Sequence, residues 1–181
     1  MSVVLLVVAM VTAVNPFRSR LGLRSEPVAM TPLVVGVAAG LGGVALLAVL
    51  APDLLSALQI TPETFLIAGG LVAIVAGARS LFFPRPFDEP PLPGWREGLW
   101  PIAFPRILSP EVVVLAIALV PQRGTGTTIA AVAVGVGAFA LLARVKVAGW
   151  TERLLVACGA VAATLLITVG IWMMIEGIRD V

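Results

Sequence analysis

Residues 99–121 read LWPIAFPRILSPEVVVLAIALVP and carry the strongest structural signal in the chain. The stretch is apolar enough to cross a bilayer, which takes roughly 20 such residues. About ten residues into it stands Ser109-Pro110-Glu111, which is typical of a helix start: a hydroxyl cap, a proline in the first turn and an acid after it. A helix start inside an apolar span predicts that the span is broken.

The composition excludes most soluble proteins and most enzymes. Of the 181 residues, 60% are apolar and 12% are charged, whereas a soluble domain averages about 25% charged residues. So small a protein has too little interior to bury this much apolar surface, which predicts an all-α membrane protein. Without His and with a single Cys, the chain lacks the groups for His-based catalysis, Cys/His zinc sites and intrachain disulfides. We therefore expect no enzyme activity, cofactor or metal.

Polar and Pro-rich segments divide the apolar sequence into six expected transmembrane helices. Residues 1–83 hold a first group of three helices and residues 99–181 a second, joined by a Pro-rich cytoplasmic linker at 84–98. All connections are short, so we expect one integral membrane domain. The six expected spans are Ser2–Leu23, Thr31–Ala51, Pro62–Phe83, Leu99–Pro121, Thr127–Ala143 and Thr151–Ile175.

The basic residues predict the orientation, because cytoplasmic loops are enriched in Lys and Arg. Of the 12 basic residues, nine lie on the predicted cytoplasmic side and Arg106 lies inside the fourth span. Only Arg123 and Arg179 lie on the opposite side, so both termini are expected outside. The positive charge thus indicates topology and not nucleic-acid binding, and the expected partners include membrane lipids. The residues on the predicted cytoplasmic side are Arg18, Arg20, Arg24, Arg79, Arg85, Arg96, Arg144, Lys146 and Arg153.

The two halves of the chain contain similar sequence segments. Asn15-Pro16 in the first span resembles Ser109-Pro110 in the fourth, and Glu63–Gly70 matches Glu152–Gly159 at four of eight positions. Three helices per half means that the halves enter the membrane in opposite directions, as in many secondary transporters. We therefore predict two inverted three-helix repeats, with the first helix of each repeat broken near the midplane.

The breaks are the expected binding site. Irregular backbone inside a membrane is tolerated only against protein or a watery cavity, so both breaks should line one central space. A half-helix that starts there offers free N–H groups and the positive end of its dipole, which favours an anion. The few charges of the spans lie near the breaks and are costly in lipid. The expected substrate-binding residues are Asn15, Arg18, Arg106, Ser109, Glu111, Thr164 and Thr168.

Each charged or hydroxyl residue of this set also has a structural interpretation. Arg18 and Arg106 are candidates to clamp a carboxylate or phosphate, and the alternative is that Arg18 and Arg20 extend to the inner interface. Glu111 either carries a coupling proton, or pairs with Arg106, or compensates the dipole of the helix that it starts. The hydroxyls of Thr164 and Thr168 bind either a ligand or their own helix backbone.

Four motifs together resemble the MarC family of six-helix inner-membrane proteins. They are Asn15-Pro16, Ala68-Gly69-Gly70, the segment WPIAFP at residues 100–105, and Ser109-Pro110. The resemblance covers most of the chain. It implies a six-helix fold in a bacterial plasma (inner) membrane and, through the LysE-like exporter superfamily, the efflux of small solutes.

These observations leave three functions open. The first is a secondary transporter or exporter of a small anionic or zwitterionic solute, with its site at the two broken helices. The second is a translocase for a lipid-linked phosphate, such as a polyprenyl phosphate, held by the same basic residues. The third is a non-transporting membrane subunit or scaffold in which the breaks are structural kinks. A homo-oligomer is compatible with each.

Overall fold

The computed structural model describes residues 2–23, 26–83 and 92–180, whose secondary structure consists of helices without any strand. Most of the elements are α-helices; η1 is a 3-10 helix and η2 a π-helix. In chain order they are α1 (Val3–Val14), α2 (Pro16–Leu21), α3 (Met30–Ala57), α4 (Pro62–Phe82), η1 (Gly94–Gly98), η2 (Leu99–Ile107), α5 (Pro110–Arg123), α6 (Thr125–Ala143) and α7 (Trp150–Arg179).

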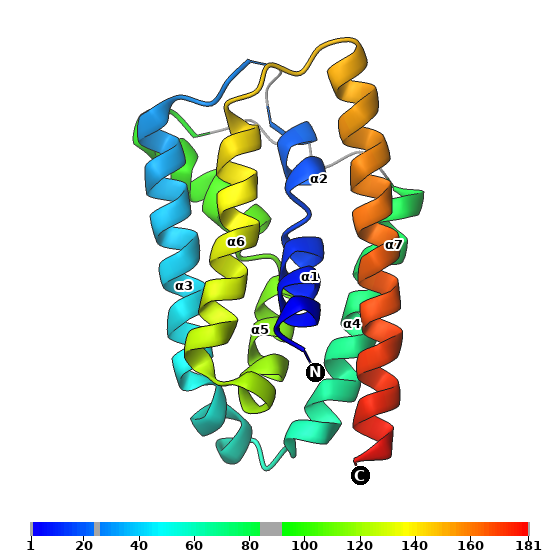
Figure 1. Ribbon diagram of the computed structural model, residues 1–181. Helices are drawn as coiled ribbons and strands as arrows, with labels where there is room; N and C mark the ends of the chain where they lie inside the picture. Colours follow the sequence, from blue (N-terminus) through cyan, green and yellow to red (C-terminus); the bar gives the residue numbers. More distant parts are fainter. Residues whose placement is uncertain (1, 24–25, 84–91, 181) are drawn as a thin grey trace.

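The helices have the length and composition of a multi-pass membrane protein. Five spans are long and apolar enough to cross a membrane, with α1 and α2 together forming one of them. The number of spans rises to six if the bent pair formed by η1–η2 and α5 is counted as one span. Both chain ends lie toward the same end of the bundle (Figure 1). The expected all-helical fold, with helices long and apolar enough to span a membrane, is therefore confirmed.

Some expected span limits were wrong. The second helix does not end at Ala51 but continues through Pro52 to Ala57, because one proline removes only a single backbone bond and membrane helices tolerate that loss. The last helix extends past Ile175 to Arg179. The other expected spans differ from the observed helices by a few residues, apart from the two that are broken.

The expected linker at 84–98 is also only partly a linker. Its first part, residues 84–91, lies outside the described residues, but Gly94–Gly98 forms η1. This short helix packs closely on α3: a Cβ added to Gly98 would lie 2.4 Å from the carbonyl oxygen of Pro32. Glycine is required there because no side chain fits, and the second group of helices therefore starts before Leu99.

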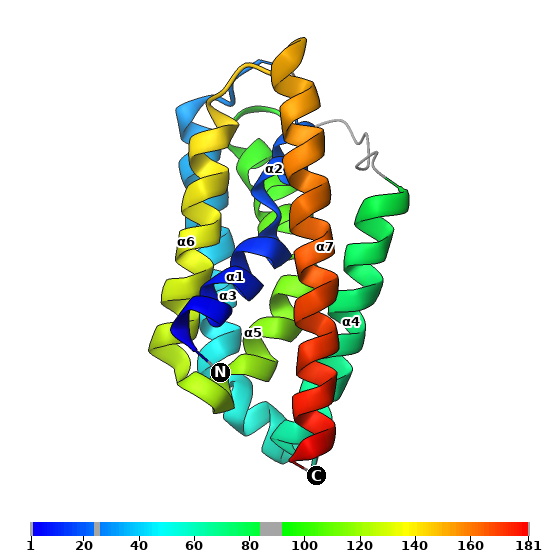
Figure 2. The same ribbon diagram turned by 45° about the vertical axis from the view of Figure 1, so that its right-hand side comes forward.

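The broken helices occupy the middle of the bundle. The α1–α2 span lies between α6 and α7, whereas η2 and α5 pack against α3 and α4 on the other side (Figures 1 and 2). Fully buried residues such as Leu6 and Met10 of α1 and Leu115 and Leu119 of α5 form the core. The surrounding helices expose large apolar residues such as Leu46, which fits a surface that faces lipid.

Helices α4 and α7 form an antiparallel pair whose contacts repeat. A Cβ on Gly77 would lie 2.6 Å from Cγ1 of Ile167, and a Cβ on Gly177 would lie 2.6 Å from Cγ1 of Ile67. The contacts of one helix on the other therefore recur when 100 is added to or subtracted from each residue number. Identical residues recur at the same spacing, namely Thr64/Thr164, Leu66/Leu166, Ile67/Ile167, Gly70/Gly170, Gly77/Gly177 and Arg79/Arg179.

This spacing differs from that of the match between Glu63–Gly70 and Glu152–Gly159. A Cβ on Gly70 would meet the carbonyl oxygen of Gly170 at 2.5 Å, whereas a Cβ on Gly159 would meet Cγ of Arg18 at 2.7 Å. The two glycines thus serve different neighbours. Apolar helices draw on few residue types, so that more than one register yields identities.

Candidate functional site

The first span is interrupted at Asn15, as expected from Asn15-Pro16. Asn15 has φ 38° and ψ 70°, which is a left-handed conformation that Asn adopts more readily than most residues. Its side-chain oxygen accepts the N–H of Arg18 at 3.2 Å, and its Nδ2 donates to the carbonyl oxygen of Gly159 at 3.1 Å. Asn15 therefore starts α2 and also ties the break to α7, with only 8% of its surface exposed.

The fourth span is interrupted at the expected place and bent by 58°. Ser109 is buried and its hydroxyl accepts the N–H of Val112 at 3.4 Å, which starts α5. The segment before this break is not the regular half-helix that we expected. Trp100 and Phe104 are extended, with φ −137° and −123°, because a residue that precedes proline is driven away from helical geometry.

Arg18 lies against α7 beside the first break. Its aliphatic stem fills the space above Gly159, which has no side chain. Its Nε is buried and has no hydrogen-bond partner among the described residues. The side chain is only partly buried overall, so the charged group combines a covered, unsatisfied donor with some access from outside the bundle.

Arg106 binds the end of α2 that lies farther from the first break. It donates to the carbonyl oxygens of Ser19, at 3.1 Å, and of Gly22, near the end of α2. Its Nε is buried without a partner in the described part of the chain. The last carbonyls of a helix lack partners within the helix, so Arg106 stabilises the end of α2 with its terminal nitrogens. Its Nε–H is then the one donor nitrogen of the side chain that no described residue binds.

Glu111 does not pair with Arg106, so that interpretation was wrong. The side-chain ion pair found among the described residues joins Lys146 to Glu26 and does not involve Glu111. The groups that act on the Glu111 carboxylate are the hydroxyl of Ser109, the backbone N–H of Glu111 and the charge of Arg79. Arg79, which we had taken only as a topology signal, thus brings a positive charge from α4 toward the second break.

Thr164 and Thr168 do not join the two breaks. Both are exposed on α7, and their hydroxyls donate to the carbonyl oxygens of Ala160 and Thr164, each at 3.1 Å. This confirms the alternative that they bind their own helix backbone. Their spacing of one turn placed them on one face of the helix, but nothing in the sequence told which face points inward.

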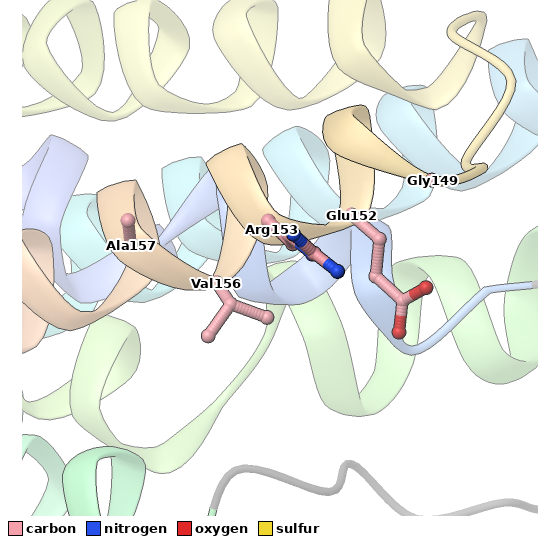
Figure 3. A pocket seen from close by; sticks show the side chains of 5 residues that line it. All are labelled: Gly149, Glu152, Arg153, Val156 and Ala157. Atoms are coloured by element: carbon pink, nitrogen blue, oxygen red, sulfur yellow. The ribbon is translucent and has the colours of Figure 1, made fainter.

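A pocket of about 490 Å³ lies at the start of α7. In Figure 3 the Glu152 and Val156 side chains extend from the helix toward the same open space. Both share a face with Gly159, which follows at helical spacing. This pocket lies about one turn from the place where Arg18 meets α7 and not between the two breaks, where we had expected one.

Gly159 is the residue of this region that sequence reasoning missed. It receives the Nδ2–H of Asn15 at its carbonyl oxygen and makes room for Arg18. A glycine within a long apolar helix is a signal for close approach, but the identity of the partner cannot be read from the helix alone.

Comparison with family models, curated proteins and solved structures finds no match to this chain.

Proposed function

We propose that this protein is a secondary transporter for a small anionic or zwitterionic solute, built from two inverted three-helix repeats around the two broken helices. The observation that carries the proposal is Arg18. Its Nε is buried without a partner in the described residues, beside a broken helix and against Gly159. A guanidinium in such a place binds an anion well, because a buried donor gains most from an ionised acceptor.

Contacts between the halves support the inverted repeat. The α4–α7 contacts recur at a spacing of 100 residues, as a two-fold axis between the helices would produce. Glycines of the second helices also face the opposite break: Gly43 of α3 approaches Leu108, and Gly135 of α6 approaches Val14. Each half thus holds the broken helix of the other, which is the arrangement in which one half rocks against the other. The MarC resemblance remains a prediction that agrees with this proposal.

Glu111 supports a coupled or zwitterionic mechanism. A half-buried carboxyl group beside Ser109 and under the charge of Arg79 is placed either to exchange a coupling proton or to bind the positive end of a zwitterion. Asn15 and Ser109 act here as positioning residues, since each starts the half-helix that follows its break.

The pocket on α7 favours the lipid-linked phosphate as a second candidate. Its lining places Arg153, together with the carboxylate of Glu152, beside the apolar side chains of Val156 and Ala157 at the surface of the bundle. A phosphate headgroup with an apolar tail has matching chemistry. Arg106, by contrast, uses its terminal nitrogens on carbonyl oxygens, as a scaffold would.

Flux into liposomes tests the transporter. The purified protein is reconstituted, and the uptake of labelled monocarboxylates, amino acids and inorganic phosphate is measured with and without a proton gradient. We expect Arg18→Ala to lower the flux of the accepted solute by at least about tenfold, as for a lost charge-assisted hydrogen bond, while Arg123→Ala at the exposed opposite end leaves it unchanged. Absence of flux for all solutes, together with retention of an anionic phospholipid through purification, would favour the lipid carrier.

A further inference from the structure

Arginine side chains join the two halves at one end of the bundle. Arg20 is completely buried and donates to the carbonyl oxygen of Val145 at 2.6 Å and to that of Glu26 at 3.2 Å. Arg106 donates to Ser19 and Gly22. We call the side chains of Arg20, Arg106 and Arg144, with the carbonyl groups that they bind, the clasp.

Further bonds extend the clasp to the connection between α2 and α3. Arg144 donates to the carbonyl oxygen of Val28 at 2.7 Å, and the N–H of Val28 donates to the carbonyl oxygen of Ala143 at 3.0 Å. Outside these bonds, Lys146 and Glu26 form an exposed ion pair at 2.9 Å, which adds little because water screens it. The loops of both halves are thereby fixed to each other and to the end of α2.

The opposite end has no such set of contacts in the described residues. There the side-chain hydrogen bonds are local: Thr61 contacts Thr64, and Thr127 and Thr128 bind carbonyl oxygens of their own helix start. The two ends of the bundle therefore differ in what holds the halves together.

Helix α2 is the element that the clasp holds. It has six residues, roughly 9 Å in length at 1.5 Å per residue. One end is the left-handed Asn15, and the other carries the carbonyls that Arg106 binds. A short rod with a break at one end and side-chain bonds at the other moves as a unit when those bonds open.

We propose that the clasp is a gate: the structure is the conformation in which this end is shut, and release of the clasp lets α2 swing about Asn15 and connect the α7 pocket with the first break. The inference rests on the proposed transporter function. Arg18 on α2 lies against Gly159, on the helix face that carries Glu152 and Val156 of the pocket. Helix α2 thus lies against α7 beside the pocket, and Asn15 binds the carbonyl oxygen of the same Gly159.

Cysteine accessibility in membrane vesicles tests the gate without relying on flux. Cys158 is the single cysteine, so Cys158→Ala gives a background in which Ala13→Cys, two residues before the break, reports access of water. Trp150→Cys and Leu58→Cys, which are exposed at the two ends, establish vesicle orientation. An impermeant maleimide is applied from the clasp side, and the rate of labelling is measured.

We expect Arg106→Gln to raise the labelling rate about tenfold, in line with the loss of charge-assisted hydrogen bonds. Arg144→Gln, at an exposed position, should raise it less, and Arg123→Gln at the other end should not change it. When Glu26→Cys and Lys146→Cys are added to the Ala13→Cys variant, a reversible bifunctional thiol reagent that joins the two loop positions should suppress labelling at position 13 until it is reduced.

The gate would be overturned if neither the arginine substitutions nor the cross-link changed the labelling rate at position 13. Because the cross-link uses two exposed residues, this result does not depend on whether Arg106→Gln folds. Labelling that depends on the clasp, without flux of any solute, would support the gate and reject the transporter. Flux of a solute, with labelling that does not depend on the clasp, would support the transporter and reject the gate.

Discussion

The two broken spans begin from the same sequence pattern and reach different geometries. At the first break, regular helix lies on both sides of Asn15, and α1 and α2 together still count as one span. At the second, the chain before Ser109 is irregular and the span bends by 58°. Asn15 is tied to α7, whereas Ser109 only starts its own helix.

The difference teaches that a cap followed by proline sets where a helix breaks, and that its neighbours set how far the chain bends. Pro101 and Pro105 drive the residues before them out of helical geometry. No proline precedes Asn15 in its span, and the bond to Gly159 ties that break to α7. Four substitutions test this contrast, in decreasing order of expected effect.

Asn15→Ala should be the most damaging. It removes a cap, leaves the Gly159 carbonyl oxygen without its partner and places alanine at a positive φ, which together lower the free energy of unfolding by about 3 kcal/mol. Unfolding in mixed micelles with increasing denaturing detergent measures the change. Asn15→Gly, which tolerates the positive φ, should recover about 1 kcal/mol of the loss. Equal losses for both variants would show that the backbone at this break is not strained.

Gly159→Ala should cost about 2 kcal/mol, because its methyl group would overlap Cγ of Arg18 and force the stem to move. Thermal unfolding of the purified protein gives the value. Gly137→Ala on α6 is the matched control, since nothing lies within 4 Å of a Cβ added there. If both glycines accept alanine equally, Arg18 does not pack on α7 as described.

Ser109→Ala should lower the free energy of unfolding by about 1 kcal/mol, the usual value of a lost helix cap. The effect is smaller than that of Asn15→Ala because the Ser109 hydroxyl binds no other helix. The same micelle titration measures it. A loss as large as that of Asn15→Ala would mean that the second break is also tied to a neighbour.

The double substitution Thr164→Val, Thr168→Val should change stability by less than about 0.5 kcal/mol, because both hydroxyls are exposed and bind their own helix. The melting temperature of the purified protein reports the change. A large loss would place these residues in a packed interface instead of on the outer face of α7.

Much of the fold was readable from local signals, and the site was readable only in part. Both breaks followed from cap and proline patterns, which act within a single turn. The partners of Arg106 and Glu111 were not readable, because an arginine side chain reaches whichever carbonyl groups the packing brings near. The register of α4 and α7 was missed for a related reason: the identities at a spacing of 100 residues become visible only when the contacts select them.

The sequence by itself determined a helical membrane protein, the approximate spans and the two interruptions, since these depend on hydropathy and on hydrogen bonds between close neighbours in the chain. Tertiary structure alone decided that Asn15 binds Gly159, that Arg20 and Arg106 fasten one end of the bundle and that the threonines of α7 face outward. The contacts of Asn15, Arg20 and Arg106 join residues far apart in the chain, and the outward face of the threonines depends on how α7 packs. Their free energy comes from packing of whole helices, which no local pattern encodes.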